Sequence, residues 1–218
     1  MKNAYILVGP PGAGKGTQAE LLDEELDIKL IQPGVFLRKE AEKDTDVGVL
    51  IRKFLAHGLI VPNQIVDKKV FQVLKKVKKD VLFDGYPRTI PQAEKLYEFL
   101  TEKKVKINFV MISLQDSLIM ERINGRRSCS CGETFHIKYN PPKKKGVCDK
   151  CDKKLFIRSD SKKNIVKKRI ELYKKETAPV IKFFKKKKRV NFVKINGAKP
   201  IEKVHQDILV IFNDNGKD

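Results

Sequence analysis

The feature that most constrains the fold is a glycine-rich segment near the amino terminus. Residues 4–8 read Ala-Tyr-Ile-Leu-Val, residues 9–17 read Gly-Pro-Pro-Gly-Ala-Gly-Lys-Gly-Thr, and apolar residues then recur at positions 19, 21, 22 and 26. A short uninterrupted apolar run is typical of a buried parallel strand, and the later spacing is that of an amphipathic helix. The segment therefore predicts a strand, a tight loop and a helix.

Further apolar runs repeat this pattern along the chain. Val81–Phe83, Asn108–Ser113 and Asn191–Ile195 each look like a strand, and amphipathic helical patterns lie between them. With 218 residues, of which 41% are hydrophobic, the chain is long enough for one substantial core. Because alternating strands and helices favour a parallel sheet covered on both faces, we predict an α/β fold, a three-layer sandwich around a central parallel sheet.

Two stretches interrupt the alternation. Residues 32–61 are helix-like without a strand candidate, and residues 125–161 contain all the cysteines, two adjacent prolines and several glycines. Insertions on an α/β core commonly carry substrate contacts. We therefore expect a core of residues 1–31, 62–124 and 162–218 with these two stretches inserted into it.

The glycine-rich segment matches a P-loop in the form G-x-x-G-x-G-K-G-T. Glycines let successive backbone N–H groups turn toward phosphate oxygens, and the start of the following helix adds a favourable field. Lys15 supplies a mobile positive charge for the β- and γ-phosphates, and the Thr17 hydroxyl can lie near Mg²⁺ or a phosphate. A mere strand-to-helix turn would need neither Lys15 nor so many glycines. The segment therefore predicts nucleotide binding.

The formal net charge of +20 raises the question of a nucleic-acid partner. Lysine clusters such as those at 75–79, 143–145 and 185–188 are spread along the chain, at expected helix surfaces and loops. The chain has no tryptophan, and few of its aromatic residues cluster as base-stacking platforms do. We therefore interpret the lysines as solvated surface that attracts nucleotides, and we expect no nucleic-acid partner.

The apolar runs are short. None approaches the length that spans a membrane, and the residues at 9–11 interrupt the first run before a secretory signal could form. We therefore expect a soluble, cytoplasmic protein without a membrane partner. A monomer is the simplest expectation, and an oligomer is left open.

The four cysteines form two closely spaced pairs, Cys129-x-Cys131 and Cys148-x-x-Cys151. Four thiolates on two such knuckles can close a tetrahedral site around Zn²⁺, and a site filled entirely by protein ligands is structural. The first pair is one residue tighter than the usual C-x-x-C spacing. Loss of the metal, His136 in place of one cysteine, a disulfide and free thiols are therefore alternatives.

A second motif indicates the kind of reaction. The strand candidate at 81–83 is followed by Asp84-Gly85-Tyr86-Pro87-Arg88-Thr89-Ile90-Pro91-Gln92-Ala93. This motif, the P-loop, and the later Gly125-Arg126-Arg127, Tyr139-Asn140-Pro141-Pro142 and Lys168-Arg169 together resemble the adenylate kinase family, in its long form with a zinc-carrying lid. The resemblance covers nearly the whole chain. It implies reversible transfer of the γ-phosphate of ATP to AMP, giving two ADP, in line, with Mg²⁺ and an arginine cluster.

The resemblance also implies roles for segments and residues. Residues 32–61 would be the monophosphate-binding insertion and residues 125–161 the zinc-type lid, and both would close on ligand. Asp84 would hold waters of Mg²⁺. Catalysis would rest on Lys15, Arg88, Arg126, Arg158 and Arg169. The ATP site would comprise Gly12, Ala13, Gly14, Lys15, Gly16, Thr17, Arg122, Arg126, Thr134, Phe135 and Lys199. The AMP site would comprise Pro33, Gly34, Arg38, Leu59, Ile60, Val61, Gly85, Tyr86, Arg88, Gln92, Arg158 and Arg169.

The chain departs from the family pattern at the monophosphate site. Where the family usually has Ser-Thr-Gly-Asp, this chain reads Gln32-Pro33-Gly34-Val35. Pro33 has neither the hydroxyl nor the backbone N–H of a threonine, so one base contact is missing. A broad-specificity nucleoside monophosphate kinase is therefore an alternative function. An alternative from another class is a P-loop ATPase or nucleic-acid-binding protein.

Overall fold

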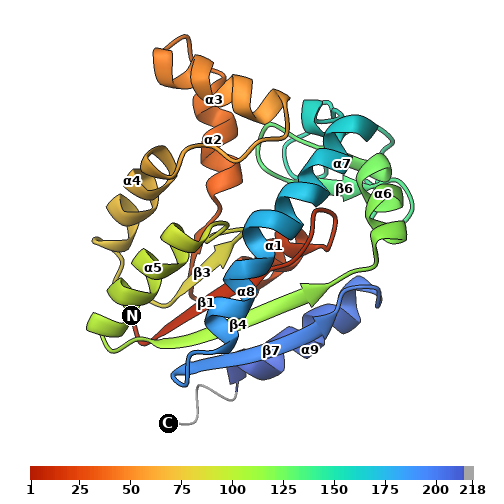
Figure 1. Ribbon diagram of the computed structural model, residues 1–218. Helices are drawn as coiled ribbons and strands as arrows, with labels where there is room; N and C mark the ends of the chain where they lie inside the picture. Colours follow the sequence, from red (N-terminus) through yellow and green to blue (C-terminus); the bar gives the residue numbers. More distant parts are fainter. Residues whose placement is uncertain (214–218) are drawn as a thin grey trace.

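Five parallel strands form the centre of the molecule. The computed structural model describes residues 1–213, so residues 214–218 of the expected core lie outside the described residues. Neighbouring strands pair in parallel throughout the sheet. This confirms the predicted α/β fold with a central parallel sheet (Figure 1). In sheet order the strands are β2 (Lys29–Ile31), β3 (Val81–Asp84), β1 (Asn3–Val8), β4 (Lys106–Ser113) and β7 (Val190–Asn196).

Alternate residues of the central strand face opposite sides of the sheet, and both sides are buried. Ala4 and Ile6 belong to one apolar cluster, whereas Tyr5 and Leu7 belong to another. Because helices cover both faces of β1, the strand has no polar alternation. This is why it appears in the sequence as an uninterrupted apolar run.

Helices form the two outer layers of the sandwich (Figure 1). Leu22 and Ile208 pack in the cluster that contains Tyr5, whereas Leu96 and Phe184 pack in the cluster that contains Ile6. One layer consists of α1 (Lys15–Glu25) and α9 (Ile201–Asn213), and the other of α4 (Asn63–Leu74), α5 (Ile90–Glu102) and α8 (Ala178–Lys185).

Two helices lie beyond the carboxyl end of β2, to one side of the sheet (Figure 1). They are α2 (Pro33–Ala41) and α3 (Asp46–Ala56), and both fall in the stretch expected to be helical. Thr45 begins α3 as a capping residue, because its hydroxyl accepts a hydrogen bond from the Gly48 N–H at 3.0 Å.

The cysteine-containing stretch lies between α6 (Asp116–Gly125) and α7 (Lys163–Leu172). It contains a small antiparallel sheet of β5 (Arg126–Ser128) and β6 (Thr134–His136), which the sequence analysis did not predict. A short 3₁₀ turn at Ser159–Ser161 precedes α7, and a π-helical segment at Tyr173–Thr177 joins α7 to α8.

The strand β2 was also missed. It has only three residues, and its first residue, Lys29, is exposed, so it leaves no apolar run in the sequence. Strands of this length are set by pairing with a neighbour, here β3, rather than by local pattern.

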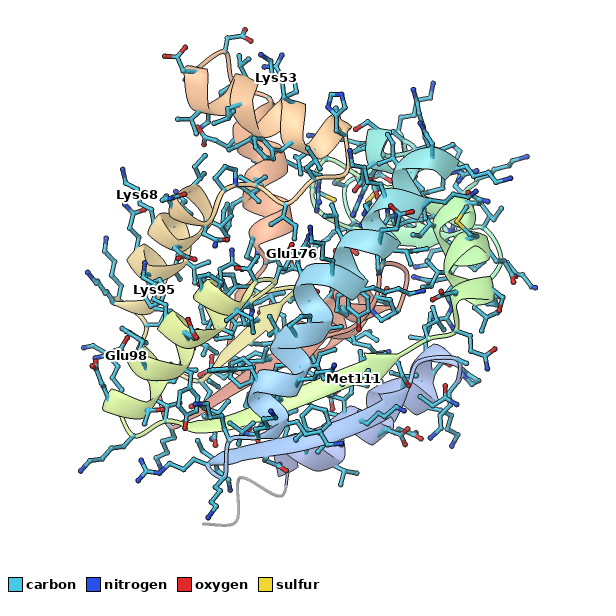
Figure 2. All side chains as sticks on the ribbon, viewed as in Figure 1. Lys53, Lys68, Lys95, Glu98, Met111 and Glu176 are labelled. Carbon is cyan, nitrogen blue, oxygen red and sulfur yellow. The ribbon has the colours of Figure 1, made fainter. Side chains whose placement is uncertain are left out.

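Most lysines lie on the outer surface, as expected. Lys53 on α3 and Lys68 on α4 point away from the sheet (Figure 2). The ammonium of Lys187 lies over the rings of Tyr97 and Phe183, at 4.7 and 4.6 Å from their centroids. Within residues 1–213, no helix combines the length and the apolar character needed to cross a membrane.

Candidate active site

A large cleft opens at the carboxyl ends of the strands, where ligands bind in open α/β sheets. Its volume is about 610 Å³, and both interrupting stretches contribute to its walls. Every residue assigned to nucleotide binding or catalysis from sequence lines it. These are Gly12, Ala13, Gly14, Lys15, Gly16, Thr17, Pro33, Gly34, Arg38, Leu59, Ile60, Val61, Asp84, Gly85, Tyr86, Arg88, Gln92, Arg122, Arg126, Thr134, Phe135, Arg158, Arg169 and Lys199.

The phosphate loop joins β1 to α1 through left-handed backbone. Gly12 has φ 78° and Gly14 has φ 90°, and Gly14 is the capping residue at the start of α1. Only glycine adopts such angles without strain, which explains the two glycines. The first turn of α1 carries no acidic side chain, so its backbone N–H groups and its dipole favour an anion.

The side chain of Lys15 is partly buried and lines the cleft. Its ammonium donates hydrogen bonds to the carbonyl oxygens of Gly9 and Pro10, at 2.8 and 2.9 Å. Burial lowers the pKa of Lys15 to about 8, and Asp84 offsets part of this effect. The side chain is therefore charged at neutral pH and begins to lose its proton slightly above it.

This lowered pKa predicts an alkaline limit on nucleotide capture. Below about pH 8, protonated Lys15 attracts phosphate, and above it the neutral amine does not. We expect kcat/KM for ATP to fall with a pKa near 8, because this ratio reports on the free enzyme. In Lys15→Arg the charge persists to higher pH, so the fall should become smaller even if activity is reduced. The same alkaline limb in both proteins would contradict the assignment.

Three arginines and one carboxylate form a network at the lid side of the cleft. Asp160 forms ion pairs with Arg169 at 2.9 Å and with Arg126 at 3.5 Å. Arg158 donates hydrogen bonds to the hydroxyls of Ser128 and Thr134, at 2.7 and 3.2 Å. Asp160 had no role assigned from sequence, and in the structure its carboxylate aligns two guanidinium groups.

The network carries excess positive charge. Burial, with the nearby Arg158 and Arg169, lowers the pKa of Arg126 to about 9. Burial alone would raise the pKa of Asp160, but Arg169 and its neighbours outweigh this and lower it. Nε of Arg126 is buried and makes no hydrogen bond within the described residues. A bound phosphate would satisfy this donor and relieve the repulsion between the arginines.

Arg38 lies on α2, and Arg88 lies in the turn between β3 and α5. Nε of Arg88 donates to the Gly85 carbonyl at 2.8 Å, and burial lowers the pKa of Arg88. Burial, with the nearby Arg158, lowers the pKa of Arg38 to about 10. Both guanidinium groups face the same cleft as the phosphate loop.

Gln92 already uses both ends of its amide within the protein. Its Oε1 accepts from the Arg88 backbone N–H at 2.8 Å, and its Nε2 donates to Asn63 at 2.9 Å. In this structure the side chain thus holds the Arg88 turn in place. Any contact with a base must add to these bonds or replace them.

Tyr139 is the clearest lining residue that the sequence analysis did not assign. Its hydroxyl donates to Glu121 at 2.6 Å, and the guanidinium of Arg122 lies 5.5 Å from its ring centroid. Phe135 is 93% buried against Cys129 and Cys148, so it packs inside the lid as well as lining the cleft. Tyr139 is the first residue of the motif Tyr139-Asn140-Pro141-Pro142. The sequence could have indicated its role, because this motif places an aromatic residue near the expected nucleotide contacts.

Glu20 on α1 also lines the cleft and was not assigned. Burial, followed by Glu133 and Asp84, raises the pKa of Glu20 to about 8. The carboxyl is therefore protonated at neutral pH. It adds no negative charge that would oppose a phosphate, and no sequence pattern revealed this.

Asp84 ends β3 beside the phosphate loop. Its Oδ2 lies 3.6 Å from the position that a Cβ on Gly16 would occupy. Mg²⁺ is commonly held through one or two carboxylates, several waters and the substrate phosphates. A single carboxylate adjoining a phosphate loop fits that donor set.

The four cysteines gather at the tip of the lid. All four Sγ atoms lie within 4.8 Å of one another, and no disulfide joins them. His136 lies elsewhere, since its Nδ1 accepts hydrogen bonds from the backbone N–H groups of Lys138 and Tyr139. The donor set of four thiols and the short distances fit a tetrahedral Zn²⁺ site, despite the tight Cys129-x-Cys131 spacing.

A parallel sheet with a phosphate loop at its carboxyl edge, facing a cleft lined by arginines, defines a P-loop nucleotide-binding α/β protein. Residues 7–189 match the family model described as "Adenylate kinase". The chain belongs to the adenylate kinase family. It is therefore a kinase of the class that transfers phosphate to a nucleoside monophosphate.

Curated relatives named adenylate kinase match over almost the full length. The protein of Thermoanaerobacter sp. (strain X514) is 43% identical over 97% of this chain and 99% of its own. That of Caldanaerobacter subterraneus subsp. tengcongensis is 44% identical over 93% of each chain. That of Methanothrix thermoacetophila is 39% identical over 93% of this chain and 95% of its own.

Proposed function

We propose that the chain catalyses reversible transfer of the γ-phosphate of ATP to AMP, giving two ADP. The observation that supports this best is the convergence of five cationic side chains on one cleft between the phosphate loop and the acceptor side. They are Lys15, Arg88, Arg126, Arg158 and Arg169. Phosphoryl transfer needs chiefly in-line positioning and stabilisation of charge on the moving oxygens, which such a ring of cations supplies.

Each side of the cleft has its own part in this mechanism. The phosphate loop and Lys15 hold the ATP phosphates, and Arg38 and Arg88 hold the phosphate of AMP. Arg126, Arg158 and Arg169 orient the group between them, and no side chain acts as a covalent nucleophile or general base. Asp84 holds waters of Mg²⁺, an ion that neutralises phosphate charge when bound.

Two segments control access to the cleft in this proposal. Residues 32–61 form the monophosphate-binding insertion, residues 125–161 form the lid, and the rest is the P-loop core. Both segments close on ligand and exclude water, so opening limits turnover. Zn²⁺ on the four cysteines has a structural role, because its ligand positions are filled by protein.

The experiment that tests the reaction is a coupled assay of ADP formation. ATP and Mg²⁺ are supplied with AMP, GMP, CMP or UMP in turn, beside a sample without acceptor. We expect rapid ADP formation with AMP and almost none without an acceptor. Equal ATP hydrolysis in all samples would instead support the P-loop ATPase alternative.

Pro33 supports a second candidate, a kinase with broader acceptor specificity. It is the first residue of α2, it is buried, and it supplies neither an N–H nor a hydroxyl to a base. Pro33→Thr should raise kcat/KM for AMP about fivefold, the effect of about one hydrogen bond, and leave the values for CMP and UMP unchanged. The assay described above measures this. Equal AMP kinetics in the two proteins would show that the missing contact is immaterial.

A further inference from the structure

The side chains of Gln32 and Asp84 meet where two neighbouring strands end. In the parallel pair of β2 and β3, Ile31 lies opposite Phe83, so the next residues along the two strands are Gln32 and Asp84. Nε2 of Gln32 donates a hydrogen bond to Oδ2 of Asp84 at 3.2 Å. Strand pairing therefore brings together two residues that are 52 positions apart in the chain.

A polar residue at the position of Gln32 would ordinarily cap the start of α2 with its side chain. Gln32 is the capping residue that precedes α2, but its side chain accepts no hydrogen bond from the helix. The amide is instead directed to the carboxylate. Its neighbours Pro33, Gly34 and Val35 have no polar side chain, so Gln32 is the polar side chain that this turn offers to the cleft.

A hydrogen bond to one oxygen restricts the carboxylate of Asp84. The same carboxylate lies beside Gly16 of the phosphate loop, so its orientation decides where its oxygens face the metal waters. Partners of this kind, one step removed from a metal, tune its binding by fixing the groups that contact it.

We infer that Gln32 is a positioning residue for the magnesium site, acting through Asp84. The inference rests on the proposed role of Asp84 in holding the waters of Mg²⁺. Because Gln32 also begins the monophosphate-binding insertion, the hydrogen bond connects the acceptor side of the cleft to the metal site. In this chain the bond exists because glutamine stands where the related pattern has a serine, whose side chain is shorter.

The test measures metal binding directly, with Mn²⁺ as the probe. Free Mn²⁺ is counted from its electron paramagnetic resonance signal while the ion is titrated into full-length enzyme saturated with ATP, without an acceptor. Gln32→Met keeps the length of the side chain but removes the donor, and Gln72→Met makes the same change on the exposed face of α4. We expect the Mn²⁺ dissociation constant to rise about tenfold in Gln32→Met and to stay unchanged in Gln72→Met.

A double-mutant cycle separates this inference from the proposed function. Asp84→Asn should weaken Mn²⁺ binding by itself, and adding Gln32→Met should then have no further effect. If Asp84→Asn weakens binding and Gln32→Met does not, the inference is wrong and the role of Asp84 stands. If Asp84→Asn leaves Mn²⁺ binding unchanged, the positioning role of Gln32 and the metal-binding role of Asp84 are both wrong.

Two further measurements test whether the effect of Gln32→Met comes from damage to the fold. Gln32→Asn retains an amide that is too short to reach Asp84, so it should reproduce the effect of Gln32→Met if folding is preserved. In either variant, kcat should approach that of the parent protein at saturating Mg²⁺. A kcat deficit that excess Mg²⁺ does not repair, with unchanged Mn²⁺ affinity, would overturn the positioning role.

Discussion

Arg126→Met is expected to lower kcat about a thousandfold while changing KM for the nucleotides little, because arginines of this kind stabilise charge mainly in the transition state. The guanidinium lies between Asp160 and Ser161, with its Nη2 3.5 and 3.0 Å from them. Its Nε is buried without a hydrogen bond among the described residues, so it is available for a phosphoryl oxygen.

The adjacent Arg127 provides a matched control. Its Nη1 donates to the backbone carbonyls of Asn124 and Arg126, at 3.2 and 2.9 Å, and it does not line the cleft. Arg127→Met should therefore keep kcat within about twofold of the parent value, since surface substitutions usually have small effects. Steady-state kinetics of both variants, with melting temperatures to confirm folding, decide the matter. Equal kcat losses would mean that Arg126 has no special role.

Removing the metal from the lid is expected to lower the melting temperature by about 10 °C or more, because a structural zinc site contributes several kcal/mol to folding. The apolar cluster inside the lid consists of Cys129, Phe135, Cys148 and Leu155, with Cys151 packed against it. Three of its five members are themselves cysteines. Without a metal this cluster buries too little apolar surface to hold the lid together.

Cys148→Ser tests the same site by mutation, since Cys148 is completely buried. We expect one zinc per chain in the parent protein, none in Cys148→Ser, and the same lowered melting temperature in Cys148→Ser and in chelated parent. Ser130→Ala is the control, because Ser130 lies between Cys129 and Cys131 but is exposed. Elemental analysis and calorimetry measure both quantities. A purified protein without zinc that melts like its chelated form would leave free thiols as the correct description.

Much of the fold follows from local pattern. The runs that became β1, β3 and β4 are mostly apolar, because both faces of the sheet are covered there. The run that became β7 lies at the edge of the sheet and includes the exposed Asn191 and Lys194. The strands that were missed lack this signal. β2 has an exposed lysine among its three residues, and β5 and β6 are also only three residues long.

Some residues of the candidate site could likewise be predicted from local sequence, whereas others could not. The phosphate loop was found from residues 9–17 and the strand and helix patterns beside them, because its function resides in closely spaced glycines and one lysine. Arg126 and Arg169 were assigned through family resemblance, since nothing in the local pattern distinguishes them from other basic residues in a chain of net charge +20. Their ion pairs with Asp160 separate them from surface cations in the structure.

The sequence by itself therefore determined the features that depend on neighbouring residues. Consecutive residues specified the buried strands, the turn of the phosphate loop and the two cysteine pairs, because each depends on neighbours within a few positions. Folding alone decided which distant groups meet. The Gln32–Asp84 hydrogen bond depends on β2 lying beside β3, and the protonated state of Glu20 depends on burial among groups from other segments. Contacts and desolvation of this kind arise only when the chain is packed, so no local pattern contains them.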